Sequence, residues 1–147
     1  VAGRAGRGDT AGRVLIQTRN PDHPAVRFAV SHNVEQFAKL ELHERKDANY
    51  PPFCRMVMVR IDSLNEGLAL SCAEDLAALA RRVCGSRAEV MGPSAAPIER
   101  LRNRFRYRIV LRAPQRRPLF EAANAMNSAK IDRRVRMHVD IDPVSML

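Results

Sequence analysis

Two arginines near the start of the chain have the spacing and the small neighbours of a phosphate-binding loop. Arg4 and Arg7 stand three residues apart, next to Gly3 and Gly6. Small residues let a backbone pack closely against a nucleotide or a neighbouring lobe, and the guanidinium groups then reach phosphate oxygens as charge develops on them. This is the chemistry of an arginine finger. A solvated basic loop fits the same short string equally well.

A second set of arginines follows the period of a β-strand. Side chains of a strand alternate between its two faces, so the apolar residues at 105, 107, 109 and 111 fall on one face and arginines on the other. Arginines two positions apart stand about 6.8 Å from each other, close to two phosphate steps of a nucleic-acid strand. Residues 134–138 repeat this alternation. The candidate nucleic-acid contacts are Arg100, Arg102, Arg104, Arg106, Arg108, Arg112, Arg134 and Arg136.

A solvated sheet face that uses charge to stay soluble is the alternative reading of these arginines. Residues 99–117 contain eight arginines and one acid, Glu99. Like charges at this density cost stability unless a polyanion relieves them, which favours nucleic-acid contact. No aromatic residues interleave on the arginine face, so the pattern does not support base-specific readout.

The composition is that of a soluble protein with an anionic partner. The 147 residues include 25 Lys plus Arg against 16 Asp plus Glu, a net charge of +9, and only three of the cations are lysines. Arginine favours bidentate phosphate contacts, although genome composition also produces such a bias. No apolar run has the roughly 18 residues of a membrane span. With no initiator methionine or secretory segment, we expect a fragment of a cytoplasmic protein.

No metal site is expected within the chain. The three cysteines, Cys54, Cys72 and Cys84, are odd in number and have no Cys-x-x-Cys spacing. The four histidines are scattered, without the pairing that metal sites require.

The pattern of elements predicts one partial and one complete domain. Residues 13–18 read as a short buried strand, and about 24–33 and 34–46 as helices, which have too little apolar surface for a core of their own. The prolines at 51 and 52 mark the boundary, giving domains at 1–48 and 49–147. We expect residues 1–48 to pack against sequence outside the chain.

The second domain is predicted to be α/β, or more narrowly α+β, with the order β-α-β-β-α-β. The expected strands are 53–61, 88–91, 104–112 and 134–141; the helices are 68–83, with capping-box spacing from Ser63 to Glu66, and 116–129. Residues 92–97 are expected to form a loop. This order is typical of a ferredoxin-like unit, whose helices cover one face of the sheet and leave the other open. Arg116 and Arg117 begin the second helix, where an acidic peptide end or a phosphate would meet free N–H groups. An ordinary helix start with two solvated arginines is the alternative interpretation.

Four separate stretches of the chain resemble one family. Val1 to Arg7 resembles the sixth helicase motif of superfamily 2 ATPases, Gln-x-x-Gly-Arg-x-Gly-Arg, with its glutamine preceding the chain. The others are Tyr-Pro-Pro-Phe at 50–53, Gly-Pro through Arg-Phe-Arg-Tyr at 92–107, and Asp-Ile-Asp-Pro at 140–143. In this order, and over essentially the whole chain, they resemble the C-terminal end of the primosomal protein N′ (PriA) family of replication-restart DNA helicases.

The resemblance implies an ATP-dependent 3′-to-5′ DNA helicase that recognises stalled forks and restarts replication through primosome assembly. Residues 1–48 would then be the end of the second RecA-like helicase lobe. It implies that Arg4 and Arg7 reach the ATP γ-phosphate, with Arg7 the better finger candidate and Gly3 and Gly6 beside the nucleotide. The partners implied are branched or forked DNA, the acidic tail of single-stranded-DNA-binding protein, with Arg116 or Arg117 as its contact, and other primosome proteins.

The chain lacks the other parts of the family's catalytic site. It contains no phosphate-binding Gly-x-x-x-x-Gly-Lys-Ser/Thr loop, no acidic Mg²⁺-binding motif and no zinc-ligand cysteine set. ATP, Mg²⁺ and zinc are therefore expected to bind upstream, and the 147 residues alone are not expected to hydrolyse ATP. A stand-alone basic ferredoxin-like module that binds nucleic acid or docks proteins, without catalysis, is the alternative function.

Overall fold

The computed structural model describes residues 14–143, which fall into two compact units divided between His43 and Glu44. The first unit contains helix α1 (Pro24–Val30) and most of helix α2 (Val34–Asp47). The second contains four strands, two helices and a short 3-10 turn, in the order β-α-β-β-α-β that the sequence predicts. Each unit is described by itself. No helix among residues 14–143 is long and apolar enough to cross a membrane.

The first unit has helices but no core of buried residues. The side chain of His23 caps α1, its Nδ1 accepting from the Ala25 N–H at 3.2 Å, and the rings of Phe28 and Phe37 pack 6.1 Å apart. Neither helix buries a residue. The strand predicted at 13–18 is wrong for its described part, 14–18, because no neighbouring strand of the described chain pairs with it; Leu15 is 91% exposed.

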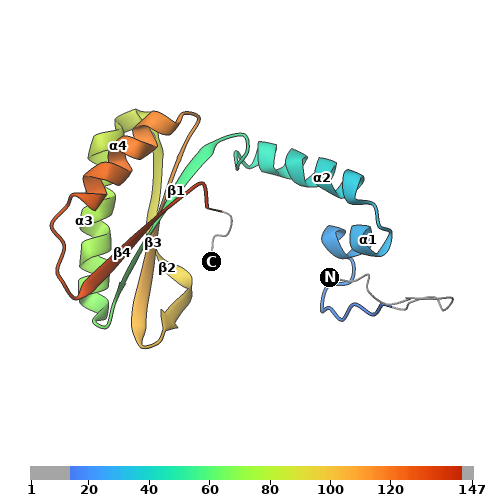
Figure 1. Ribbon diagram of the computed structural model, residues 1–147, viewed down its shortest axis with the longest axis horizontal. Helices are drawn as coiled ribbons and strands as arrows, with labels where there is room; N and C mark the ends of the chain where they lie inside the picture. Colours follow the sequence, from blue (N-terminus) through green and yellow to red (C-terminus); the bar gives the residue numbers. More distant parts are fainter. Residues whose placement is uncertain (1–13, 144–147) are drawn as a thin grey trace, which may run out of the picture. The chain divides into compact units, whose positions relative to one another are not determined.

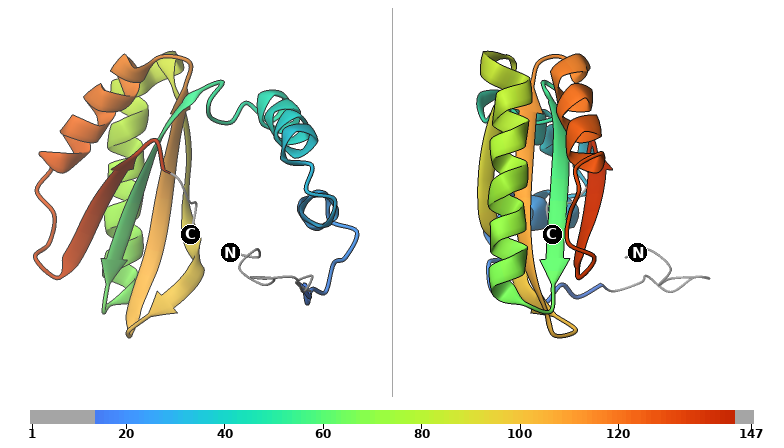
Figure 2. Two further views of the ribbon diagram at one scale, coloured as in Figure 1. Left: turned by 45° about the vertical axis from the view of Figure 1, so that its right-hand side comes forward. Right: turned by 90° about the vertical axis from the view of Figure 1, so that its left-hand side faces the viewer.

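The second unit is a two-layer structure (Figure 1). Strands β1 (Arg55–Ser63), β2 (Glu89–Leu101), β3 (Arg104–Ala113) and β4 (Val135–Ile141) form an antiparallel sheet in the order β2-β3-β1-β4. Helices α3 (Glu66–Cys84) and α4 (Arg116–Asn127) lie side by side over one face of this sheet (Figure 2).

Strand alternation builds the core between sheet and helices. Val57, Val59 and Ile61 of β1 face the helices, and Ile109 and Leu111 of β3 pair beside them. On α3, small residues form the buried stripe, and α4 adds Leu119 and Met126. The small stripe lets the helix lie close to the sheet.

The opposite face of the sheet is only partly open, contrary to the prediction. A second apolar cluster lies at one end of it, made of Cys54, Met56, Met58 and Val110 with Met91 beside them. The residues before β1 fold against this end, where the Cys54 thiol donates to the Asn49 carbonyl at 3.0 Å. The exposed part of this face is therefore confined to its other end.

β2 is longer than the sequence predicts, because the segment 92–97, expected as a loop, belongs to it. Its pairing with β3 shifts between Met91 and Ser94 and again between Ala95 and Arg100. Gly92 lies at the first shift with φ +94°, and a Cβ there would stand 2.7 Å from the Arg108 carbonyl oxygen. Glycine and proline indicated a loop, whereas here they mark a bulge within a strand.

The start of α3 also differs from the prediction. Asn65, rather than Ser63, is the N-cap, and its side chain accepts from the Leu68 N–H at 3.0 Å. Ser63 is buried at the end of β1, where its hydroxyl donates to the Arg134 carbonyl and accepts from the Asn65 N–H. The helix ends at Cys84 with Gly85 as its C-cap, one residue beyond the predicted range 68–83.

Candidate nucleic-acid interface

Basic residues meet across three neighbouring strands on the exposed part of the sheet. In the strand register Arg60 of β1 stands opposite Arg108 of β3 on one side and His138 of β4 on the other. Two residues further along β1, Asp62 stands between Arg106 of β3 and Arg136 of β4. Residues that face each other across an antiparallel pair have Cβ atoms about 5 Å apart, so these charges lie within one small area.

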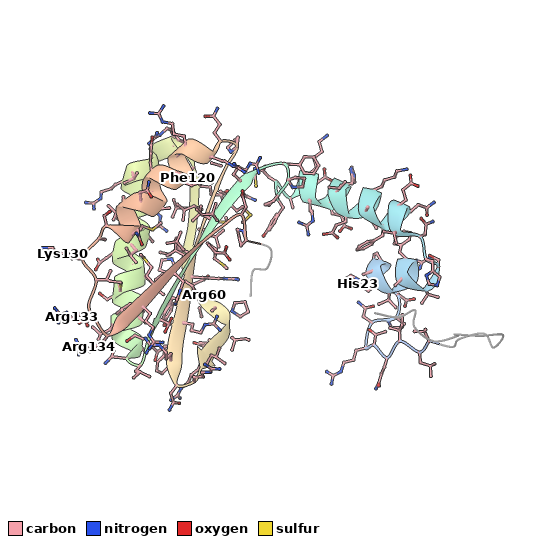
Figure 3. The ribbon with its side chains drawn as sticks, in the orientation of Figure 1. His23, Arg60, Phe120, Lys130, Arg133 and Arg134 are labelled. Atoms are coloured by element: carbon pink, nitrogen blue, oxygen red, sulfur yellow. The ribbon has the colours of Figure 1, made fainter. Side chains whose placement is uncertain are left out.

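This area is hollowed. A depression of about 380 Å³ is lined by Arg60, Asp62, Leu101, Arg102, Arg104, Arg106, Arg136 and His138. Figure 3 shows Arg60 on the side of the sheet away from α3 and α4. We call this depression the sheet-face hollow. Its five arginines and one aspartate give it a charge of +4 with His138 neutral, which suits a phosphate backbone.

Arg104 is the structural anchor of the hollow. Its guanidinium forms an ion pair with Asp62 and also donates to the Asp62 carbonyl at 3.0 Å and the Arg134 carbonyl at 3.4 Å. Only 16% of its side chain is exposed. Arg104 therefore ties β3 to β1 and to the residue before β4, and it presents less charge to a ligand than its neighbours do.

The remaining predicted contacts lie at other places. Arg112 is at the far end of β3, where it pairs with Glu89 at 2.6 Å and donates to the Ala48 and Asn49 carbonyls. Arg100 stacks over the ring of Phe105, with 5.1 Å from its Cζ to the ring centroid. The structure thus brings together Arg102, Arg104, Arg106, Arg108 and Arg136, and separates Arg100 and Arg112 from them.

Arg134 lies one residue before β4 and is held by Asp132. Its Nε and Nη2 donate to the two carboxylate oxygens at 3.0 and 2.7 Å. These hydrogen bonds lower the pKa of Asp132 to about 2 and raise that of Arg134. The pair fixes the turn that leads into β4.

Two basic residues of the sheet-face hollow, Arg60 and His138, were not among the predicted contacts. The signal for Arg60 was present in β1, where Met56, Met58, Arg60 and Asp62 alternate with residues that face the core. His138 follows Arg136 at the strand period. The prediction considered the arginines of β3 and those around the start of β4, but not β1, which lies between these two strands in the sheet.

Arg116 and Arg117, the predicted protein contacts, are the first two residues of α4 and are both exposed. Arg116 lies 3.4 Å from an oxygen of Asp142, and Arg117 lies 2.9 Å from Glu121. Hydrogen bonds from Arg117 and Arg87 lower the pKa of Glu121. Arg117 and Arg87 also border a depression with Pro114, Gln115 and Pro118.

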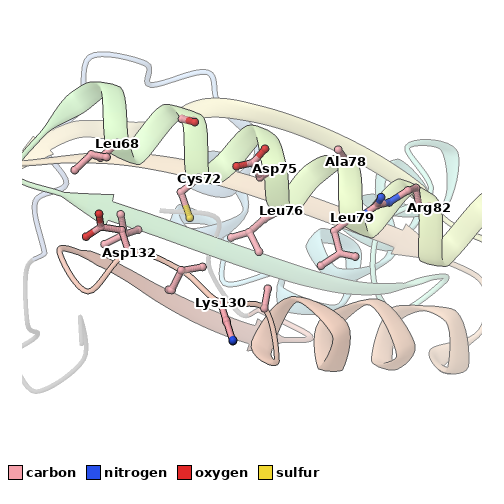
Figure 4. Close-up of a pocket in the computed structure, with 13 residues that line it drawn as sticks. Leu68, Cys72, Asp75, Leu76, Ala78, Leu79, Arg82, Lys130 and Asp132 are labelled. Atoms are coloured by element: carbon pink, nitrogen blue, oxygen red, sulfur yellow. The ribbon is translucent and has the colours of Figure 1, made fainter.

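A larger groove of about 600 Å³ runs along the helical layer, between α3 and residues 129–132 (Figure 4). Its floor is apolar, with Leu68, Leu76 and Leu79 among its residues. Its charged residues balance, Asp75 and Asp132 against Arg82 and Lys130. This groove therefore does not share the polyanion chemistry of the sheet-face hollow.

The residues predicted to contact the nucleotide are not covered by the structure. Gly3, Arg4, Gly6 and Arg7 lie outside the described residues. Within residues 14–143, no three His, Cys, Asp or Glu side chains group closely enough to hold a metal ion.

Known proteins resemble the chain along its whole length. Residues 46–144 match the family described as the primosomal protein N C-terminal domain. Replication restart protein PriA of Bacillus subtilis is 30% identical over 151 aligned positions, covering 100% of this chain and 19% of the relative. PriA of Treponema pallidum is 35% identical and PriA of Synechocystis 30%, over 100% and 99% of this chain and 22% and 17% of the relatives. The chain spans about a fifth of the length of these relatives. The resemblance inferred from the sequence is thus confirmed, and the chain belongs to the primosomal protein N C-terminal domain family.

Proposed function

We propose that the chain is the C-terminal part of an ATP-dependent 3′-to-5′ DNA helicase that recognises stalled replication forks and restarts replication through primosome assembly. In this proposal the second unit binds branched or forked DNA through the sheet-face hollow. The observation that carries it is the gathering of five arginines around a single carboxylate in one depression. Such a concentration of like charge is stabilised when phosphates neutralise it.

The proposed architecture is a ferredoxin-like unit that follows the end of a RecA-like lobe, residues 1–48. The strand order β2-β3-β1-β4, with both helices on one face, supports the ferredoxin-like assignment. The absence of buried residues in α1 and α2 supports packing of the first unit against sequence outside the chain.

The proposed ATPase role rests on the opening motif. In the longer protein Arg4 and Arg7, with Gly3 and Gly6 beside them, complete a nucleotide site whose remaining parts, with Mg²⁺, lie upstream. Zinc would also bind upstream. Arginine forks stabilise the charge that develops on a transferred phosphoryl group, and the 147 residues alone supply no other part of that site.

The proposed protein partners are the acidic tail of single-stranded-DNA-binding protein and other primosome proteins, in the cytoplasm. Arg116 and Arg117, exposed at the start of α4, support an acidic tail as a ligand. The tail would have to compete with Asp142 and Glu121 for these guanidinium groups.

Fluorescence anisotropy tests the DNA-binding proposal. The 147-residue chain is titrated with a fork, a duplex and a single strand over a salt series, beside an Arg60→Gln/Arg106→Gln variant. We expect the variant to lose about 1.8 of the log-log salt slope on duplex, about 0.9 for each phosphate contact. Arg82→Gln, which removes a charge from the helical layer, is the matched control. Binding that is equally weak in all three proteins would reject the sheet-face hollow as a DNA site.

A further inference from the structure

A second basic depression adjoins the sheet-face hollow around the end of the sheet. It has a volume of about 220 Å³ and lies where β1 passes into α3 and the α4–β4 connection passes into β4. Arg104 and Arg136 line both depressions. The two depressions therefore adjoin at these side chains, at this corner of the unit. We call the second depression the corner hollow.

The corner hollow has its own cations. Arg133 and Arg134 line it together with Leu64 and Asn65, and Figure 3 shows both arginines at the end of the unit where β4 begins. Arg134 is engaged with Asp132, as described above. No acid within residues 14–143 forms an ion pair with Arg133 or with Arg136. These two guanidinium groups are the ones available to phosphates at the corner.

We propose that the two hollows form one curved track that binds a single nucleic-acid strand, with phosphates at Arg106 and Arg136 in the sheet-face hollow and at Arg133 in the corner hollow. This inference rests on the proposed DNA-binding function and names the strand form that occupies its site. The track turns from the sheet face around the edge of the unit. A duplex has a persistence length of about 150 base pairs and resists such a turn, whereas a single strand follows it.

The linings of the two hollows agree with this occupant. Each has an exposed leucine, Leu101 in the sheet-face hollow and Leu64 in the corner hollow, which offers apolar contact to sugars or bases. Neither lining includes Phe, Tyr or Trp, so bases would stack on guanidinium planes or on the imidazole of His138. Contacts of this kind tolerate any base, and the track is therefore not sequence-specific.

The test compares two cations of the same connection. Arg133 lines the corner hollow, whereas Lys130, three residues earlier, lines the groove of the helical layer. The 147-residue chain and its Arg133→Gln and Lys130→Gln variants are titrated with fluorescein-labelled (dT)20 and with a 20-base-pair duplex over a salt series. Circular dichroism checks that each variant is folded.

We expect Arg133→Gln to lower the log-log salt slope on (dT)20 by about 0.7, the single-strand value for one phosphate contact, and to leave the duplex slope unchanged. Charge reversal in Arg133→Glu should weaken (dT)20 binding further. Lys130→Gln should leave both slopes unchanged.

An Arg106→Gln variant separates the two proposals. If it weakens binding and Arg133→Gln has no effect on (dT)20, the track is rejected and the sheet-face hollow stands as the DNA site. If Arg133→Gln lowers the duplex slope as much as the single-strand slope, the corner binds duplex and the single-strand assignment is wrong. If Arg106→Gln has no effect on either DNA, the proposed DNA-binding function itself is rejected.

Discussion

The guanidinium of Arg104 forms an ion pair with the carboxylate of Asp62 across the β1–β3 ladder, in the middle of a surface that is otherwise basic. About 15% of each side chain is exposed, and no buried side-chain nitrogen or oxygen of the described residues lacks a hydrogen-bond partner. The arginines of β3 look equivalent in the sequence, but the structure gives Arg104 a different role from its neighbours. Arg104 holds the strands together, whereas Arg106 and Arg136 are the cations that the proposed DNA site offers to phosphates.

Replacing Arg104 by alanine should lower the free energy of unfolding by about 1–3 kcal/mol, because the largely buried Asp62 carboxylate loses its ion-pair partner and two backbone carbonyls each lose one donor. Urea unfolding followed by circular dichroism measures this change. Arg136→Ala is the matched control, since no acid of residues 14–143 forms an ion pair with it, and its stability should change by less than about 0.5 kcal/mol. Equal effects of the two substitutions would contradict the anchor role of Arg104.

The order of strands and helices in the second unit follows from local patterns, and so could be predicted from the sequence. Period-two alternation in β1 and β3 and period-3.6 spacing in α3 are fixed by which residues can be buried. Burial on the two faces of the sheet was harder to predict. On the face away from the helices, burial depends on which other segments of the chain cover it. Met56 and Met58 read as one half of an alternating strand, and only the fold shows them buried in a second cluster.

The sequence predicted a basic sheet face as the candidate site, but it did not predict all the residues that line this site. Arginine alternation in β3 gave the correct face for Arg106 and Arg108, yet Arg60 and His138 come from strands distant in sequence and adjacent only through the sheet. The separation of Arg112 also depends on tertiary partners, Glu89 and the carbonyls before β1. The strand expected at 13–18 fails for a related reason, since a strand needs a partner that the described chain does not supply.

Gly92 should be the glycine of the second unit least tolerant of substitution. Gly92→Ala places a Cβ 2.7 Å from the backbone oxygen of Arg108 at a φ that alanine rarely adopts, and should destabilise the unit by about 1–3 kcal/mol. Gly67→Ala is the control. Gly67 lies in the first turn of α3, its added Cβ would meet only Asn65 Oδ1 at 3.5 Å, and alanine there should be neutral or stabilise by up to about 1 kcal/mol.

Thermal unfolding of the two glycine variants measures the difference, and DNA binding gives a second readout. Because the clash falls on the β3 backbone at Arg108, Gly92→Ala should also weaken DNA binding at temperatures where the variant remains folded. A Gly92→Ala protein as stable as the wild type would show that the bulge between Met91 and Ser94 is not formed as described.

The carboxyl of Asp132 should titrate near pH 2. Hydrogen bonds from Arg134 lower its pKa from 3.8 to about 2, so the ionised carboxylate contributes stability above pH 4 that is lost as the pH falls towards 2. NMR titration of the side-chain carboxyl carbon measures the midpoint directly. In Arg134→Gln the midpoint should return towards 3.8, and an unchanged midpoint would contradict the pairing.

The finger assignment makes a prediction for the longer protein that contains this chain. Arg7→Ala should lower the ATP turnover number by about 10³-fold or more and change nucleotide binding less, because the lost interaction forms only as charge develops in the transition state. Arg7→Lys keeps the charge without the bidentate fork and should recover only part of the rate. Steady-state ATPase assays with single-stranded DNA present, beside nucleotide-binding measurements, separate the two effects.

The sheet-face variant Arg60→Gln/Arg106→Gln is the control for the Arg7→Ala prediction. At saturating DNA this variant should keep its turnover number, but it should require more DNA to reach it. Turnover unchanged in Arg7→Ala would reject the finger and leave the opening segment as a solvated basic loop.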